Sequence, residues 1–197
     1  AGATAGKFPG AKALKLKLLG DGGDADRVRA VRAARPDVWI GVDANQGFTP
    51  QTLAEAMPAF LEARVELIEQ PYKIGQEHLL DGASFPIPLA ADESVQSLKD
   101  VEGLVGRFQV MNIKLDKCGG VTEGLMMAKR AKELGLKVMV GNMTGTSLGM
   151  APAMLVGQYC DVVDLDGPLF LKTDRDPAII YDEGLVSAPA GVWGWSA

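Results

Sequence analysis

Residues 38–43 read Val-Trp-Ile-Gly-Val-Asp, a short run of β-favouring residues that ends in a carboxylate. Two later runs, Val65–Glu69 and Ile87–Asp92, also end in a carboxylate, and a stretch long enough for a helix separates the first of them from residue 43. Strands that alternate with helices in this way form βαβ units and a parallel sheet. We therefore predict an α/β fold.

Four further strand candidates flank these runs: Ala13–Leu18, Val110–Lys114, Lys137–Gly141 and Val162–Leu165. Helical patterns cover Ala25–Ala34, Pro50–Ala63 and Thr122–Leu134, a shorter helix follows Val95, and another begins near Pro152. The residue that ends each strand recurs at steps of 22 to 27 positions. Such a steady period favours a TIM-type (β/α) barrel over a doubly wound sheet, whose connections vary more in length.

The barrel predicted from this pattern is incomplete, because seven strands are found where a closed barrel needs eight. Residues 7–12 look like the end of a helix and a turn that lead into the strand at Ala13, so we expect the first strand upstream of residue 1. Residues 1–197 are then one domain, made of strands 2 to 8 and a C-terminal tail. Trp193 and Trp195 of this tail are expected to pack against the rest of the molecule.

Composition and charge exclude several classes of partner. The formal net charge of −5 argues against binding to nucleic acid. The longest uncharged stretch, Gly141–Cys160, contains polar side chains that would be costly in lipid, so we expect no membrane partner. The two cysteines, Cys118 and Cys160, do not make a disulfide framework and fit a reducing compartment, which predicts a cytoplasmic protein.

Three successive strands end in the carboxylates of Asp43, Glu69 and Asp92. The carboxyl ends of barrel strands meet at one rim, so these side chains are expected side by side. Converging carboxylates repel one another unless they bind a cation, and a site of oxygen ligands suits Mg²⁺. The alternative is three unrelated helix N-caps, which would explain any one of them alone but not three at matched positions.

Lysines complete the candidate site. In Leu14-Lys15-Leu16-Lys17-Leu18, alternation places the leucines on one face and both lysines on the other, toward the interior of the barrel. Lys114 ends a strand on the opposite side of the ring. Because nearby cations lower the pKa of an amine, lysines placed here can act as bases, and a carbon between Lys17 and Lys114 can lose a proton to one and regain it from the other. A half-exposed edge strand is the alternative for residues 14–18.

Together these residues resemble the enolase superfamily, in its muconate-lactonising branch, from about Ala13 to the end of the chain. The resemblance implies a modified (β/α)7β barrel with an N-terminal capping domain, which we expect to be absent here, and homo-oligomers. It assigns Lys17 and Lys114 as the acid/base pair and Asp43, Glu69 and Asp92 as Mg²⁺ ligands. The chemistry it implies is metal-assisted removal of a proton next to a carboxylate, which gives an enediolate.

The segment Asp164-Leu165-Asp166 indicates which reaction of this family the protein catalyses. Alternation puts both carboxylates on one side at the end of the last strand, where they can hold an ammonium group. The motif is similar to the Asp-x-Asp of dipeptide epimerases, which bind the amino terminus of a dipeptide there. We therefore predict an isomerase that epimerises the C-terminal residue of a dipeptide by 1,1-proton transfer, with Lys15 neutralising the substrate carboxylate. A polar turn is the alternative.

Two further residues are candidates for substrate binding. Thr144 lies in residues 142–147, which resemble the substrate-carboxylate region of the family but could equally start a helix with hydroxyl caps. Asp116 lies two residues after Lys114. It could orient the base or the substrate, and the alternative is a charged loop residue exposed to solvent.

Rival functions remain open at this point. A muconate cycloisomerase or o-succinylbenzoate synthase would use the same machinery. An inactive or ligand-binding barrel fragment is the alternative from another class, since the first strand and the capping domain are expected to be missing.

Overall fold

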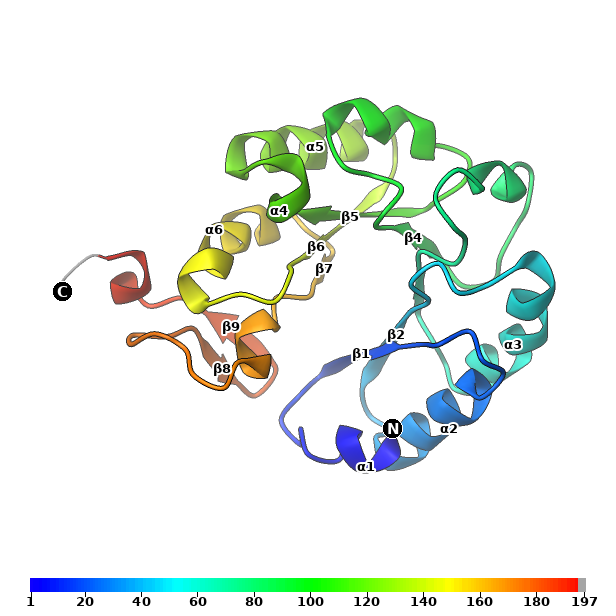
Figure 1. Ribbon diagram of the computed structural model, residues 1–197, viewed down its shortest axis with the longest axis horizontal. Coiled ribbons are helices and arrows are strands. Elements are labelled where there is room, and N and C mark those ends of the chain that lie inside the picture. The colour runs from blue at the N-terminus through cyan, green and yellow to red at the C-terminus, as the bar shows by residue number, and fades with distance from the viewer. Residues whose placement is uncertain (195–197) are drawn as a thin grey trace. The chain divides into compact units, whose positions relative to one another are not determined.

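The computed structural model describes residues 1–194, which form two compact units (Figure 1). The first unit contains residues 1–94 and 106–108, and the second contains residues 95–105 and those from 109 onward. Trp195, which we expected to pack against the molecule, lies outside the described residues.

Four parallel strands form the sheet of the first unit, in the order of the chain. They are β1 (Ala13–Lys17), β2 (Trp39–Asp43), β3 (Leu67–Glu69) and β4 (Leu89–Ala91). The helices are α1 (Gly2–Ala5), α2 (Asp24–Ala34), α3 (Pro50–Glu62) and the 3-10 turn η1 (Glu77–Leu80). The predicted βαβ order is confirmed here, although β3 and β4 are shorter than predicted.

Helix α3 shows how local sequence fixes these boundaries. The Thr49 side chain accepts a hydrogen bond from the backbone N–H of Thr52, whose hydroxyl accepts one from the N–H of Thr49, which makes a reciprocal cap. Pro50 occupies the first helical position, where its missing N–H costs nothing. Phe60, near the C-terminal end of α3, is fully buried and packs edge to face against Phe48, with ring centroids 6.1 Å apart. The cap therefore fixes the start of the helix, and this aromatic contact holds its last turns in place.

The second unit has three parallel strands, β5 (Val110–Lys114), β6 (Lys137–Gly141) and β7 (Val162–Val163). Its helices are α4 (Leu115–Cys118), α5 (Val121–Glu133) and α6 (Ser147–Gly157), with 3-10 segments η2 (Leu98–Leu104), η3 (Gly167–Phe170) and η4 (Ala190–Trp193). An antiparallel hairpin of β8 (Ile180–Asp182) and β9 (Leu185–Ser187) follows.

Two predictions for the second unit are wrong in detail, and one element was not predicted. Helix α6 begins at Ser147 rather than near Pro152, because the Thr146 hydroxyl accepts from the N–H of Gly149 and caps it. Strand β7 ends at Val163, two residues earlier than predicted. The β8–β9 hairpin was not predicted, since strands of three residues carry too little periodicity to be read from sequence.

No helix among the described residues is long and apolar enough to cross a membrane. Cys118 and Cys160 are both free cysteines. Burial raises the pKa of the Cys160 thiol to about 12, so this thiol stays protonated.

Candidate active site

The register of the first unit's sheet brings acidic and basic side chains into one row. Lys17 pairs with Asp43 across β1 and β2, and Asp43 pairs with Glu69 across β2 and β3. Glu69 pairs in turn with Ala90, so Asp92, two residues further along, lies on the same face just past the end of β4. Parallel pairing thereby makes neighbours of residues that lie 23 to 26 positions apart in sequence.

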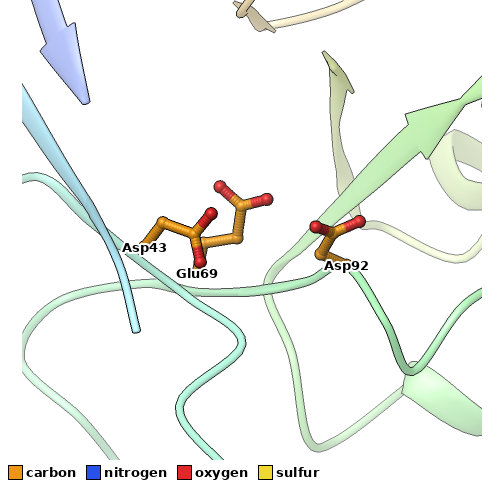
Figure 2. Close-up of side chains that lie close together, drawn as sticks. All are labelled: Asp43, Glu69 and Asp92. Carbon is orange, nitrogen blue, oxygen red and sulfur yellow. The ribbon is translucent and has the colours of Figure 1, made fainter. Parts of the chain in front are cut away.

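Asp43, Glu69 and Asp92, hereafter the carboxylate trio, point toward one another (Figure 2). One oxygen from each lies within 4.8 Å of the others. The residues are 0%, 0% and 3% exposed. Three carboxylates so close and so well removed from water are costly unless positive charge faces them.

This spacing fits a divalent cation. Mg²⁺ takes oxygen ligands at about 2.1 Å. The oxygens of the trio, all within 4.8 Å of one another, are near enough for one such ion to be held by all three after the side chains move toward it. All three donors are hard oxygens, which Mg²⁺ prefers.

Two lysines of β1 face the trio. The Lys15 ammonium lies 2.9 Å from Glu69 Oε2 and 3.9 Å from Asp43 Oδ2, and the Lys17 ammonium donates to Asp43 Oδ2. The side chain of Lys15 is 14% exposed and that of Lys17 is 61% exposed. The exposure of Lys17 agrees with the half-exposed edge strand that was the alternative for residues 14–18. Both ammonium groups nevertheless contact the trio, and the catalytic role of the lysines stays a prediction.

The pKa of Glu69 reflects both its burial and the charges around it. Burial raises the pKa of Glu69 to about 7; the Lys15 ammonium opposes this rise, and the carboxylates of Asp43 and Asp92 add to it. Lys15 and Lys17 both place an ammonium group beside these carboxylates. A cation bound between the carboxylates would favour the ionised form of Glu69.

Gln70 positions one member of the trio, and the sequence analysis missed it. Its side-chain oxygen accepts from the backbone N–H groups of Asp92 (3.0 Å) and Ser94 (3.1 Å). Its side-chain nitrogen donates to the carbonyl of Tyr72 and the hydroxyl of Ser94. The residue is 1% exposed and has a φ of 39°, a strained value for a residue other than glycine. A polar residue directly after a metal-ligand candidate was the only signal available in the sequence.

Replacing Gln70 should destabilise the protein. Gln70→Met keeps the length of the side chain but leaves buried N–H and C=O groups without their partners, so we expect the free energy of unfolding to fall by about 2–4 kcal/mol. Chemical denaturation measures this change. Gln76→Met is the matched control, because Gln76 is exposed, and it should change stability by less than about 0.5 kcal/mol. Equal effects of the two substitutions would contradict the role given to Gln70.

In the second unit, Lys114 ends β5 and is 7% exposed. It pairs with Gly141 of β6, and a Cβ atom added to Gly141 would lie only 3.2 Å from Lys114 Cε and 2.9 Å from Asn112 Oδ1. The missing side chain at Gly141 therefore provides the space in which the Lys114 side chain lies. The opposition of Lys114 and Lys17 stays a prediction.

The other predicted residues of the second unit lie near the ends of its strands. Asp164 and Asp166 are half-buried on either side of Leu165, which is 3% exposed. They follow β7 rather than belong to it, so strand alternation is not what orients them. Asp116 is exposed in α4 and accepts weakly from the N–H of Met143, at 3.4 Å. Thr144 is exposed in the loop between β6 and α6, and the hydroxyl cap of α6 comes from Thr146 instead.

Comparison with known proteins agrees with this geometry. Residues 3–191 match the family described as enolase C-terminal domain-like. The chain is 41% identical over 169 residues to a protein of a Pseudoalteromonas species named N-acetyl-D-glutamate racemase, a match that covers 85% of this chain and 54% of that protein.

Two of the solved structures that share its fold contain a bound dipeptide. An enolase family member from Agrobacterium tumefaciens with homology to dipeptide epimerases, solved with bound sodium and L-Ala-L-Glu, has a TM-score of 0.89 and 42% identity, covering 99% of this chain and 59% of that one. A dipeptide epimerase from Methylococcus capsulatus, solved with Mg and L-Arg-D-Lys, has a TM-score of 0.85 and 30% identity, covering 92% and 55%. The predicted barrel fold class is thereby confirmed. The chain spans about half the length of the curated relatives it matches.

Proposed function

Because this chain belongs to the enolase C-terminal domain-like family, we propose that the protein carrying it is a Mg²⁺-dependent epimerase of dipeptides. It would invert the α-carbon of the C-terminal residue by removing a proton from one face and returning one to the other. The observation that carries the proposal is the buried carboxylate trio with two lysines on the same face of the sheet. The Mg bound to the Methylococcus capsulatus enzyme supports the choice of metal.

The roles of the residues follow from their charges. Asp43, Glu69 and Asp92 would hold Mg²⁺, which when bound stabilises negative charge developing on the substrate carboxylate. Lys15, beside Glu69, would add a second positive charge there. The Lys17 amine, which donates to Asp43 Oδ2 in this structure, would face the substrate α-carbon when Asp43 is engaged with the metal. Lys114 would serve the other face, so that the deprotonated, enediolate form of the substrate is reprotonated with inversion.

Asp164 and Asp166 would bind the substrate ammonium group. An N-acylated amino acid and a dipeptide present the same carboxylate and α-carbon, and they differ in the charged amine that only the dipeptide carries. Two half-buried carboxylates suit that amine by charge-assisted hydrogen bonds. The L-Ala-L-Glu bound to the Agrobacterium tumefaciens protein supports a dipeptide as substrate.

Racemisation of an N-acetylated glutamate is the second candidate, favoured by the 41% identity to the Pseudoalteromonas protein. Two substrates in deuterated buffer separate the candidates: L-Ala-L-Glu and N-acetyl-L-glutamate. The proposal expects Mg²⁺-dependent deuterium at the α-carbon of the glutamate residue, with the higher kcat/KM for the dipeptide. A higher kcat/KM for the acetylated amino acid would favour the second candidate, and exchange into neither substrate would refute both.

Neutralising the Asp-x-Asp carboxylates should weaken dipeptide binding selectively. We expect Asp164→Asn and Asp166→Asn each to raise KM for L-Ala-L-Glu by about 10- to 100-fold, the value of one charge-assisted hydrogen bond. N-propionyl-L-glutamate, which differs from the dipeptide by the loss of its amine, should keep its inhibition constant. Asp182→Asn is the matched control, because Asp182 is exposed and the substitution removes the same charge. Equal losses for both ligands would contradict an ammonium site.

A further inference from the structure

Tyr181 in the C-terminal hairpin lies directly behind the Asp-x-Asp segment. Residues alternate along β8, so that Ile180 and Asp182 are exposed while Tyr181 is half-buried and paired with Val186 of β9. The Tyr181 hydroxyl donates to the carbonyl oxygen of Leu165 at 2.7 Å. This hydrogen bond thus connects the hairpin to the middle residue of the Asp-x-Asp segment, 16 positions earlier in the chain.

The hydrogen bond from Tyr181 is made to a segment that belongs to no strand or helix. The N–H of Asp164 still bonds to the carbonyl of Val140, as in a parallel strand, but β7 has ended at Val163 and η3 begins only at Gly167. The Leu165 residue between the two carboxylates is 3% exposed. A buried carbonyl in such a segment needs a donor, and the tyrosine supplies one.

The electrostatic setting keeps Tyr181 in its donating form. Burial raises the pKa of Tyr181, and the negative charges of Asp166, Asp174 and Asp164 raise it further. The hydroxyl therefore stays protonated throughout the range in which an enzyme operates. Both carboxylates of the Asp-x-Asp segment are among these charges.

The opposite end of the motif is fixed by close packing. A Cβ atom added to Gly167 would lie 2.1 Å from Asn142 Nδ2 and 2.9 Å from the Met143 carbonyl oxygen. The loop after β6 therefore presses against the residue that follows Asp166. The motif is held by this contact on one side and by the tyrosine on the other.

We infer that Tyr181 is a positioning residue for substrate recognition, holding the Leu165 carbonyl so that Asp164 and Asp166 present their carboxylates together to the ammonium group of the substrate. The inference rests on the proposed function of these two carboxylates. Tyr181 itself need not touch the substrate.

Tyr181→Phe tests this role, because it removes only the hydroxyl. We expect KM for L-Ala-L-Glu to rise about 5- to 20-fold, the effect of losing one well-placed hydrogen bond, with kcat changed less than about twofold. The inhibition constant of N-propionyl-L-glutamate should stay within about twofold of the wild-type value. Tyr159→Phe is the matched control, since Tyr159 is 57% exposed, and it should leave both constants unchanged.

Asp164→Asn, measured beside Tyr181→Phe, separates failure of the inference from failure of the proposed function. If Asp164→Asn weakens only the dipeptide but Tyr181→Phe changes neither ligand, or both ligands equally, the positioning role is overturned and the ammonium site stands. If Asp164→Asn fails to distinguish the two ligands, the ammonium site is overturned and the inference with it.

Discussion

Replacing either Lys17 or Lys114 by alanine should lower the rate of epimerisation by about 10²- to 10⁴-fold, roughly 3–5 kcal/mol of transition-state stabilisation. Each amine is expected to be the only base on its face of the substrate, so inversion at the α-carbon fails when either is missing. Lys114→Met is a useful second variant, because Lys114 is 7% exposed and methionine keeps most of the buried stem while removing the amine.

Isotope exchange makes this prediction stereospecific. In deuterated buffer, Lys17→Ala should still exchange the α-proton of one C-terminal epimer without inverting it, and should fail to exchange the other. Lys114→Ala should show the reverse preference. Lys12→Ala and Lys137→Ala remove amines from exposed positions in the same two units and should behave as wild type. Unchanged epimerisation in either active-site variant would refute the two-base scheme.

The parts of the site that sequence predicts are those fixed by strand pairing. A parallel strand that ends in a polar residue delivers that residue to one edge of the sheet, so evenly spaced endings sufficed to bring Asp43, Glu69 and Asp92 together. Alternation in β1 was equally informative, because it placed Lys15 and Lys17 on one face. These inferences need only the period of a strand and the direction of the chain.

The parts that sequence did not predict depend on contacts between residues far apart in the chain. Gln70 is recognised only when its side chain is seen to bond to Asp92 and Ser94. Tyr181 lies in a strand of three residues, too short for a periodic signal, and gains its role from a bond to Leu165. The early end of β7 likewise shows that Asp164 and Asp166 owe their placement to packing rather than to strand alternation.

Removal of the metal, or of one of its ligands, should have the second large effect. Chelation of Mg²⁺ should lower activity by about 10³-fold or more, because charge on the substrate carboxylate then develops without a cation beside it. Glu69→Gln should lower activity by a similar factor, and adding more Mg²⁺ should not restore it. Glutamine suits this test because burial already raises the pKa of Glu69 to about 7, so the pocket accepts a neutral side chain of the same shape.

Thermal unfolding with and without Mg²⁺ detects the loss of binding independently of activity. At a Mg²⁺ concentration about 100 times the dissociation constant, binding stabilises the wild-type protein by about 2.7 kcal/mol, and Glu69→Gln should show almost none of this gain. Glu66→Gln removes the same charge from an exposed position three residues earlier and should keep the full gain. Either Mg²⁺ stabilisation equal to wild type in Glu69→Gln, or none in the wild-type protein, would show that the carboxylate trio does not hold the metal. The lysines would then have to act on a substrate bound without it.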